Sequence, residues 1–172
     1  MRHCFGRRQT NTLKTAIDIG PIETYLAANR FKGLAIGAHL AHPDRKVLAV
    51  MGDGSFLMNS QEMETAVREN IPLKILVWVD DSYGLIKWKM DMESGSHDCV
   101  DFGNPDFVAY AESFGARGYR IESAAELLPT LQKALDEPGV SLVACPVDYS
   151  ENMALINSLG ELTPALCALD EL

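Results

Sequence analysis

The chain has 172 residues, of which 47% are hydrophobic and 23% charged, which suits one globular domain with a hydrophobic core and excludes wholesale disorder. The formal net charge of −9 argues against a surface for nucleic acid or anionic membrane, and no apolar run approaches the roughly 20 residues that span a bilayer. Four scattered cysteines without a Cys-x-x-Cys pair argue against a zinc site or a disulfide framework and indicate a reduced, cytoplasmic protein.

The two ends of the chain differ in charge from its middle. Residues 1–14 contain lysine and arginine but no acidic residue, whereas the residues from Glu151 onward contain aspartate and glutamate but no lysine or arginine. We expect residues 1–30 to form a basic, poorly ordered leader without an assigned role. Residues 31–150 are expected to form the folded domain, and residues 151–172 an acidic extension that packs on the domain or on a partner.

Strand and helix patterns alternate between these ends. The predicted elements are a helix over 33–41, a strand over 46–51, a helix over 58–69, a strand over 75–79, a helix opening at Asn104-Pro105, a strand near 119–121, a helix over 124–135 with Ser123 as its N-cap and a strand over 141–147. The run Lys46–Met51 is continuously apolar after its lysine, which is typical of a strand buried on both faces. The pattern therefore predicts an α/β domain with a mostly parallel sheet and helices on both faces.

Acidic and glycine residues follow two successive predicted strands. The first strand runs into Gly52-Asp53-Gly54-Ser55, and the second into Asp80-Asp81-Ser82-Tyr83-Gly84. Since the carboxyl ends of parallel strands lie at one edge of the sheet, Asp53 and Asp80 should meet in a crevice there. Two carboxylates placed together repel unless one takes a proton or a cation bridges them. Ligands that offer only oxygen favour a hard ion, Mg²⁺ or Ca²⁺.

The glycines indicate what else this crevice holds. Gly52 and Gly54 let the backbone approach a bulky anion, and Ser55 adds a hydroxyl at the start of the next helix. Because Mg²⁺ in proteins usually bridges carboxylates and phosphate oxygens, the pattern predicts a metal-diphosphate site. Each signal alone also fits an ordinary structural role: Gly-Asp-Gly can be a plain turn, and Asp81 is expected to cap the helix that follows it.

Residues 52–84 resemble the thiamine-diphosphate motif, a Gly-Asp-Gly followed, after a helix and a strand, by Asn or Asp. Five segments are similar to the acetolactate synthase branch of the thiamine-diphosphate-dependent enzymes: residues 52–66, 78–86, 101–107, 111–116 and 146–152. Asp at position 80 is more similar to the catabolic acetolactate synthases than to the biosynthetic ones. The resemblance identifies the chain as the C-terminal, diphosphate-binding domain of such an enzyme.

The resemblance implies roles for particular residues. Asp53 and Asp80 would ligate Mg²⁺ through their side chains and Ser82 through its backbone carbonyl, while Gly54 and Ser55 would donate hydrogen bonds to the diphosphate. Gly84, Leu85 and Ile86 would open the helix beside the cofactor. The full set expected to bind thiamine diphosphate and Mg²⁺ is Gly52, Asp53, Gly54, Ser55, Asp80, Ser82, Tyr83, Gly84 and Leu85. No residue is assigned a catalytic role.

The implied reaction is decarboxylation of pyruvate and its ligation to a second pyruvate, giving 2-acetolactate, with the cofactor carrying the carbon chemistry. The implied partners are pyruvate or another 2-oxo acid, and either further copies of the chain or a chain that carries the pyrimidine-binding domain. In the family, a glutamate of that domain activates the cofactor ring. We therefore expect this chain to be an isolated diphosphate-binding domain that works with a pyrimidine-binding domain in trans.

Two other functions stay open. The chain could belong to another thiamine-diphosphate-dependent 2-oxo acid decarboxylase or carboligase with a different acceptor. It could also be a non-catalytic assembly module, because Arg30 stands where the similar Asn-Gly-Phe segment of the family has glycine and the family's Gly-x-Met-Gly turn is missing. A metal-dependent phosphatase is more distant, since it needs a second Asp where Ser55 stands.

Overall fold

The computed structural model describes residues 22–26 and 31–149, and its centre is a five-stranded sheet in the order β1-β2-β3-β5-β4. All neighbouring strands are parallel. The strands are β1 (Ile22–Leu26), β2 (Lys46–Gly52), β3 (Lys74–Val79), β4 (Arg117–Arg120) and β5 (Ser141–Pro146). The sheet confirms the predicted α/β class with a parallel sheet.

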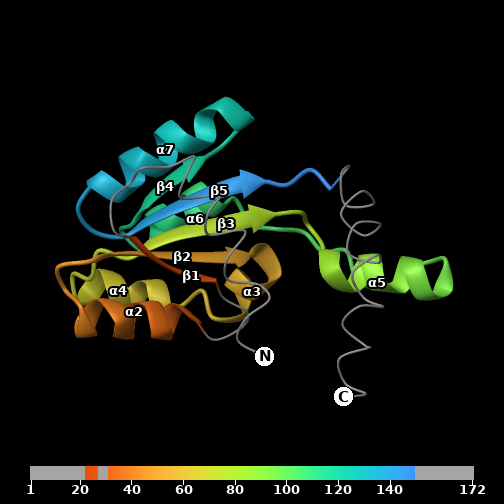
Figure 1. Ribbon diagram of the computed structural model, residues 1–172, viewed down its shortest axis with the longest axis horizontal. Coiled ribbons are helices and arrows are strands. Elements are labelled where there is room, and N and C mark those ends of the chain that lie inside the picture. Colours follow the sequence, from red (N-terminus) through yellow and green to blue (C-terminus); the bar gives the residue numbers. More distant parts are fainter. Residues whose placement is uncertain (1–21, 27–30, 150–172) are drawn as a thin grey trace, which may run out of the picture.

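Six helices lie within residues 31–149. They are α2 (Phe31–Ala41), α3 (Asp53–Met58), α4 (Glu62–Arg68), α5 (Gly84–Ser94), α6 (Phe107–Ser113) and α7 (Ala124–Asp136). Helices α2, α3, α4 and α6 contribute to the core on one face of the sheet, and α7 to the core on the other face. Helix α5 projects beyond the ends of β3, away from the sheet (Figure 1), and contains no buried residue. Helices therefore cover both faces, as predicted.

The central strands are buried on both faces because each face has its own hydrophobic core. On β2, Val47 and Ala49 join the core under α2, α3, α4 and α6, whereas Leu48 and Val50 join the core under α7. The same alternation recurs on β3 and β5. This arrangement gives every side chain of an apolar run a packing partner, which explains why these strands lack a polar face.

The boundaries of several elements differ from the predicted ones. The helix predicted over 58–69 is α4, which begins only at Glu62, and a separate helix, α3, ends at Met58 before a break at residues 59–61. Helix α3 starts within the Gly-Asp-Gly-Ser segment, because Gly52 is extended (φ −76°, ψ 163°) and the chain turns into the helix at Asp53. Asn59, with φ −141°, ends that helix.

The helix predicted to open at Asn104-Pro105 begins instead at Phe107. Its N-cap is Asp106, whose carboxylate accepts hydrogen bonds from the backbone nitrogens of Val108 (2.9 Å) and Ala109 (3.3 Å). Asn104 is thereby left outside the helix. Ser123 occupies the predicted N-cap position of α7, but its side chain makes no capping hydrogen bond.

Strand β4 begins and ends earlier than predicted, at residues 117–120. Glycine is required within it, since a Cβ at Gly118 would lie 2.6 Å from the Cα of Val108 in α6. The close approach holds α6 against the edge of the sheet.

Strand β1 lies in the region predicted to be a leader, where no element was predicted. The other residues of 1–30 and all of 151–172 lie outside the described residues, so the leader and the acidic extension stay predictions. Arg30 and two of the four cysteines, Cys4 and Cys167, also fall outside; Cys99 and Cys145 have free thiols. Within the described ranges, no helix combines the length and apolar character needed to cross a membrane.

Candidate functional site

The site is built where β2 and β3 end side by side. Gly52 and Trp78 are register partners in the parallel pair, so both strands stop at the same edge of the sheet. After β2 the chain turns directly into α3, and after β3 it forms a short loop, residues 80–83, before α5. A cavity of about 820 Å³ opens at this edge.

All nine residues predicted to bind a cofactor line this one cavity. They are Gly52, Asp53, Gly54, Ser55, Asp80, Ser82, Tyr83, Gly84 and Leu85. Helix α5 begins at Gly84, where the resemblance predicted a helix to open. The geometry brings the predicted residues together from β2, α3, the 80–83 loop and α5, and their role in binding stays a prediction.

Asp53 joins the two strand ends through its carboxylate. Its side chain is only 1% exposed. Oδ1 accepts a hydrogen bond from the Gly54 nitrogen (2.7 Å), and Oδ2 accepts bonds from the nitrogens of Asp80 (3.1 Å) and Asp81 (2.9 Å). These amides compensate the carboxylate for lost water, and those of Asp80 and Asp81 fix the loop after β3 to the start of α3.

Asp80 lies beside Asp53 and is partly buried. Burial raises the pKa of the Asp80 carboxyl above its ordinary value, the hydrogen bond from the Tyr149 hydroxyl (2.9 Å to Oδ2) lowers it, and the negative charge of Asp53 raises it again. Among the described residues, no lysine or arginine forms an ion pair with either carboxylate. The pair consequently lacks positive charge, which a bound cation would supply.

The donor set is suited to a cation that also takes ligands from elsewhere. Within the described ranges, no group of three or more His, Cys, Asp or Glu side chains is arranged to hold a metal. Two carboxylates and nearby backbone carbonyls form an incomplete shell of oxygens. Mg²⁺ typically binds in this way, through one or two carboxylates, with phosphate oxygens and water completing its octahedron.

Two glycines keep the cavity wall free of side chains. A Cβ at Gly84 would lie 2.2 Å from Asp80 Oδ2, and a Cβ at Gly54 would lie 2.9 Å from a ring carbon of Tyr83. The start of α5 can therefore approach the Asp80 carboxylate directly. Any other residue at position 84 would have to displace that carboxylate.

Asp81 does not cap α5, so that prediction is wrong. The N-cap position of α5 is Tyr83, and no side chain caps it. Asp81 has a left-handed backbone (φ 53°), and its Oδ1 accepts a hydrogen bond from Asn104 Nδ2 at 2.7 Å. The same nitrogen lies 2.6 Å from Asp53 Oδ2.

The sequence analysis missed two residues of the site, Asn104 and Tyr149. It treated Asn104 only as the start of a helix, and it gave Tyr149 no role. Both fall in segments that carry the family resemblance, residues 101–107 and 146–152, which was the available signal. Their contacts join segments 51 and 69 residues apart, which no local pattern predicts.

One wall of the cavity is apolar and faces solvent. Leu85 is 74% exposed and Ile86 54%, and the side chains of Met58, Tyr83 and Tyr149 are also exposed. All five line the cavity. An exposed apolar wall beside a polar floor is typical of a site that another protein surface covers.

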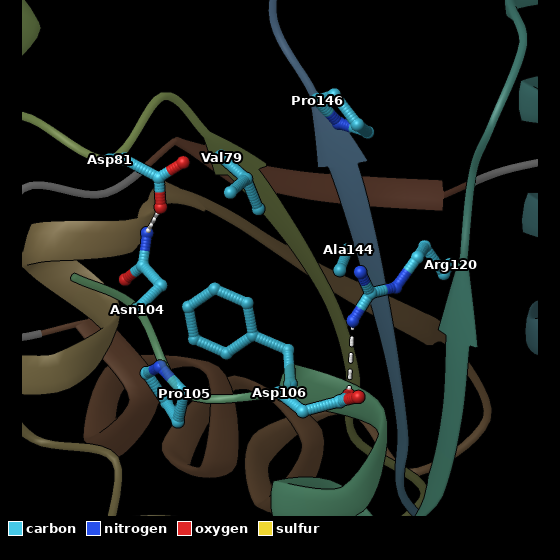
Figure 2. Close-up of a pocket in the computed structure, with 9 residues that line it drawn as sticks. Val79, Asp81, Asn104, Pro105, Asp106, Arg120, Ala144 and Pro146 are labelled. Carbon is cyan, nitrogen blue, oxygen red and sulfur yellow. Dashed lines mark hydrogen bonds and ion pairs between the residues drawn. The ribbon is translucent and has the colours of Figure 1, made fainter.

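A second, smaller cavity of about 380 Å³ lies beyond the ends of β3 and β5. Figure 2 shows its rim, with the ion pair between Arg120 and Asp106 (3.1 Å) on one side and the hydrogen bond between Asn104 and Asp81 on the other. Asp81 and Asn104 line this second cavity, whereas Asp53 and Asp80 line the larger one. Asn104 thus lies between the two.

The sequence was compared with models of known protein families. Residues 29–145 match the family described as "Thiamine pyrophosphate enzyme, C-terminal TPP binding domain". The matched range contains all six helices and every strand except β1 and the last residue of β5.

Two similar proteins are named acetolactate synthases. The catabolic acetolactate synthase of Raoultella terrigena is 46% identical over 125 residues, which cover 73% of this chain and 22% of that protein. The acetolactate synthase of Bacillus subtilis (strain 168) is 44% identical over 121 residues, covering 70% of this chain and 21% of that protein. The chain thus spans about a fifth of the length of these relatives.

A solved structure with a similar fold is the thiamine diphosphate-dependent 4-hydroxybenzoylformate decarboxylase of Rhodococcus jostii RHA1. It superposes with a TM-score of 0.63 at 29% sequence identity, over 68% of this chain and 22% of that one.

Proposed function

Because the chain belongs to the family of thiamine pyrophosphate enzymes, in which it matches the C-terminal TPP binding domain, we propose that its larger cavity binds the diphosphate of thiamine diphosphate through Mg²⁺. Thiamine pyrophosphate and thiamine diphosphate are the same compound. The observation that carries the proposal is the pair Asp53 and Asp80, which lie together, without an ion pair to any described lysine or arginine, at the edge of a parallel sheet where ligands bind.

Each residue of the cavity would have a distinct part in this binding. Asp53 and Asp80 would ligate Mg²⁺ through carboxylate oxygens, and Ser82 through its backbone carbonyl. Gly54 and Ser55 would donate hydrogen bonds to the diphosphate, and Gly52 leaves room for its approach. Tyr83, Gly84 and Leu85 form the wall beside it.

When bound, thiamine diphosphate supplies the chemistry that breaks the carbon–carbon bond next to a 2-oxo group. The residues of this chain bind and orient the cofactor, and we assign none of them a proton transfer. Their contribution would be to fix the diphosphate end of the cofactor in the cavity that Leu85 and Ile86 also line.

The reaction that we propose is the conversion of pyruvate to 2-acetolactate. It is supported by the relatives at 46% and 44% identity, both of which are named acetolactate synthases. As the chain spans about a fifth of those proteins, we propose that a pyrimidine-binding domain on a second chain completes the active site. The exposed apolar wall of the cavity supports such a partner.

Two alternatives remain distinct from this proposal. The similarity to the 4-hydroxybenzoylformate decarboxylase favours, as a second candidate, a 2-oxo acid decarboxylase that forms an aldehyde instead of acetolactate. A domain that only assembles with partners would keep the fold without binding the cofactor.

The first test is thermal unfolding of the chain with Mg²⁺ and thiamine diphosphate, added separately and together. A ligand at about 100 times its dissociation constant stabilises the folded chain by about 2.7 kcal/mol. We expect a rise in melting temperature that needs both ligands, because oxygens of the carboxylates and of the diphosphate would share one metal shell.

Asp53→Ala should lose that rise, since it removes a proposed ligand. Asp44→Ala, which changes an exposed aspartate before β2, at the opposite end of that strand from the cavity, is the matched control and should keep it. A wild-type chain whose melting temperature does not respond to the two ligands together would contradict cofactor binding and favour the assembly module.

A further inference from the structure

Asn104 bridges two carboxylates with a single nitrogen. Its Nδ2 lies 2.6 Å from Asp53 Oδ2 and 2.7 Å from Asp81 Oδ1. The orientation of the amide is chemically required, because the opposite one would place a carbonyl oxygen against two carboxylate oxygens. Both N–H groups of the amide are consequently committed to carboxylates.

The oxygen of this amide, Asn104 Oδ1, is buried, and no described residue donates a hydrogen bond to it. A buried acceptor without a partner makes the folded state less stable. The hydrogen bonding of the Asn104 oxygen therefore does not explain why an asparagine stands at this position. A buried polar group without a protein partner calls for an explanation, and the two contacts of the amide nitrogen offer one. The two carboxylates are the only groups that its nitrogen contacts among the described hydrogen bonds.

Asn104 ends a strap, residues 100–104, that holds the 80–83 loop from outside. The Tyr83 nitrogen donates to the Val100 oxygen (2.8 Å), and the Phe102 nitrogen donates to the Asp81 oxygen (3.0 Å). Ser82 and Asp101 form an antiparallel bridge between them. Asp81 is held in its left-handed conformation by the strap on its backbone and by Asn104 on its side chain.

The bridge adds a third donor to the oxygen of Asp53 that two backbone nitrogens already hold. Oδ2 receives three N–H donors, from Asp80, Asp81 and Asn104. Oδ1 receives only one among the described bonds, from Gly54. A carboxylate oxygen has two lone pairs, so Oδ2 is saturated and Oδ1 keeps one for a metal ion.

We propose that Asn104 is a positioning residue of the metal-diphosphate site: its amide orients the Asp53 carboxylate so that Oδ1 faces the metal, and it locks the 80–83 loop that carries Asp80 and Ser82. The inference rests on the proposed function, because it assigns Asn104 a role in binding that same Mg²⁺. Residues that orient a metal ligand from behind typically contribute about 10- to 100-fold to metal affinity.

The test uses two substitutions that remove the bridge in different ways. Asn104→Ala deletes both donors and leaves space, whereas Asn104→Leu deletes both donors and keeps nearly the same volume. Asp101→Ala is the control within the strap, because it removes only the exposed ion pair with Lys87. Val143→Ala is the control for global stability, since Val143 is buried under α7 on the opposite face of the sheet.

Two quantities are measured on the full chain. The first is the dissociation constant of Mg²⁺ at saturating thiamine diphosphate, by calorimetry. We expect both Asn104 variants to raise it about 10- to 100-fold, with both controls unchanged within error. The second is hydrogen exchange of the 80–83 amides without any ligand, which both Asn104 variants should accelerate about tenfold or more relative to Val143→Ala.

The outcomes separate this inference from the proposed function. Normal Mg²⁺ affinity in Asn104→Ala, or recovery in Asn104→Leu, would overturn it, because the residue would then act through packing alone or not at all. If the wild-type chain binds neither ligand, the proposed function fails and exchange decides the positioning role: acceleration confined to the 80–83 amides supports it, and unchanged exchange refutes it.

Discussion

Two charged residues of this domain show how hydrogen bonds offset the cost of burying a polar group. Asp53 and Lys74 are both almost fully buried, at opposite ends of the sheet. Asp53 is surrounded by backbone and amide N–H donors, and Lys74 by carbonyls: its Nζ donates to the oxygens of Glu137 (2.6 Å) and Gly139 (2.7 Å). The first arrangement leaves a negative charge beside a cavity, while the second closes the far end of β3 against the turn after α7.

Lys74 should make the stability of the domain depend on alkaline pH. Burial and then the charge of Arg117 lower the pKa of Lys74 from 10.5 to about 8. Between about 8 and 10.5 the unfolded chain therefore binds a proton that the folded chain has lost, so stability rises with pH across this window and is level below it. Relative to Lys74→Met, the free energy of unfolding of the wild type should rise by up to about 3 kcal/mol.

Urea unfolding of both proteins at several pH values across that window measures this difference. Tyrosines and thiols also ionise in alkaline solution, but both proteins share them and their effects cancel in the difference. Parallel pH dependence in the two proteins would show that Lys74 keeps an ordinary pKa.

At the scale of elements, the way α5 begins beside the site leads to a prediction about Gly84. A Cβ at this position would lie 2.2 Å from Asp80 Oδ2. In Gly84→Ala the Asp80 carboxylate must move, so the stabilisation by Mg²⁺ and thiamine diphosphate together should fall by about 1.4 kcal/mol or more, a tenfold loss of affinity. The free energy of unfolding without ligands should change little, because alanine favours the helix over glycine by up to about 1 kcal/mol. This gain offsets the cost of moving the Asp80 carboxylate.

Gly37→Ala is the matched control, since Gly37 lies in a helix with no atom within 4 Å of an added Cβ. It should raise stability and leave the response to the ligands intact. Thermal unfolding with and without both ligands reads out each variant, and an unchanged ligand response in Gly84→Ala would show that Asp80 is not held at this contact.

The elements also show where the sequence was sufficient and where it was not. The apolar runs of β2, β3 and β5 predicted the sheet, because burial on both faces leaves a direct signature in composition. The helix predicted over 58–69 was wrong in its extent, because α3 and α4 are separated by a break at Asn59 that helical periodicity does not mark. Strand β1 lies at the sheet edge in a region that was predicted to be a leader.

The candidate site was predictable to the same degree and for a similar reason. Strand-end residues such as Asp53 and Asp80 could be brought together from topology alone, since parallel strands end at one edge. Asn104 could not, because it reaches Asp53 from a loop whose path depends on the strap against residues 80–83. The role of Asp81 was misjudged for the same reason: its partner lies 23 residues away.

At the scale of the whole molecule, the described residues place a cavity with an acidic floor beside an exposed apolar wall. Helix α5 has no buried residue, and Leu85 and Ile86 lie on the cavity side with most of their surface in solvent. A surface of this kind is stabilised by burial against a partner, and each large side chain buried there contributes about 1.5–3 kcal/mol. Binding of a polar ligand by the carboxylates of the cavity floor would not by itself need these exposed apolar side chains, so they favour a partner surface.

The wall predicts that turnover depends on a second chain. With pyruvate, Mg²⁺ and thiamine diphosphate, this chain alone should form no product, whereas addition of a chain that carries a pyrimidine-binding domain should give 2-acetolactate. Ile86→Asp should abolish that complementation by placing a charge in the interface. Leu128→Asp, which changes an exposed leucine on α7, should leave it intact.

Acetaldehyde in place of acetolactate would identify a decarboxylase, and product from the chain alone would contradict the need for a partner. A chain that associates through this wall but neither binds the cofactor nor turns over would be an assembly module, since the apolar wall would then serve association alone.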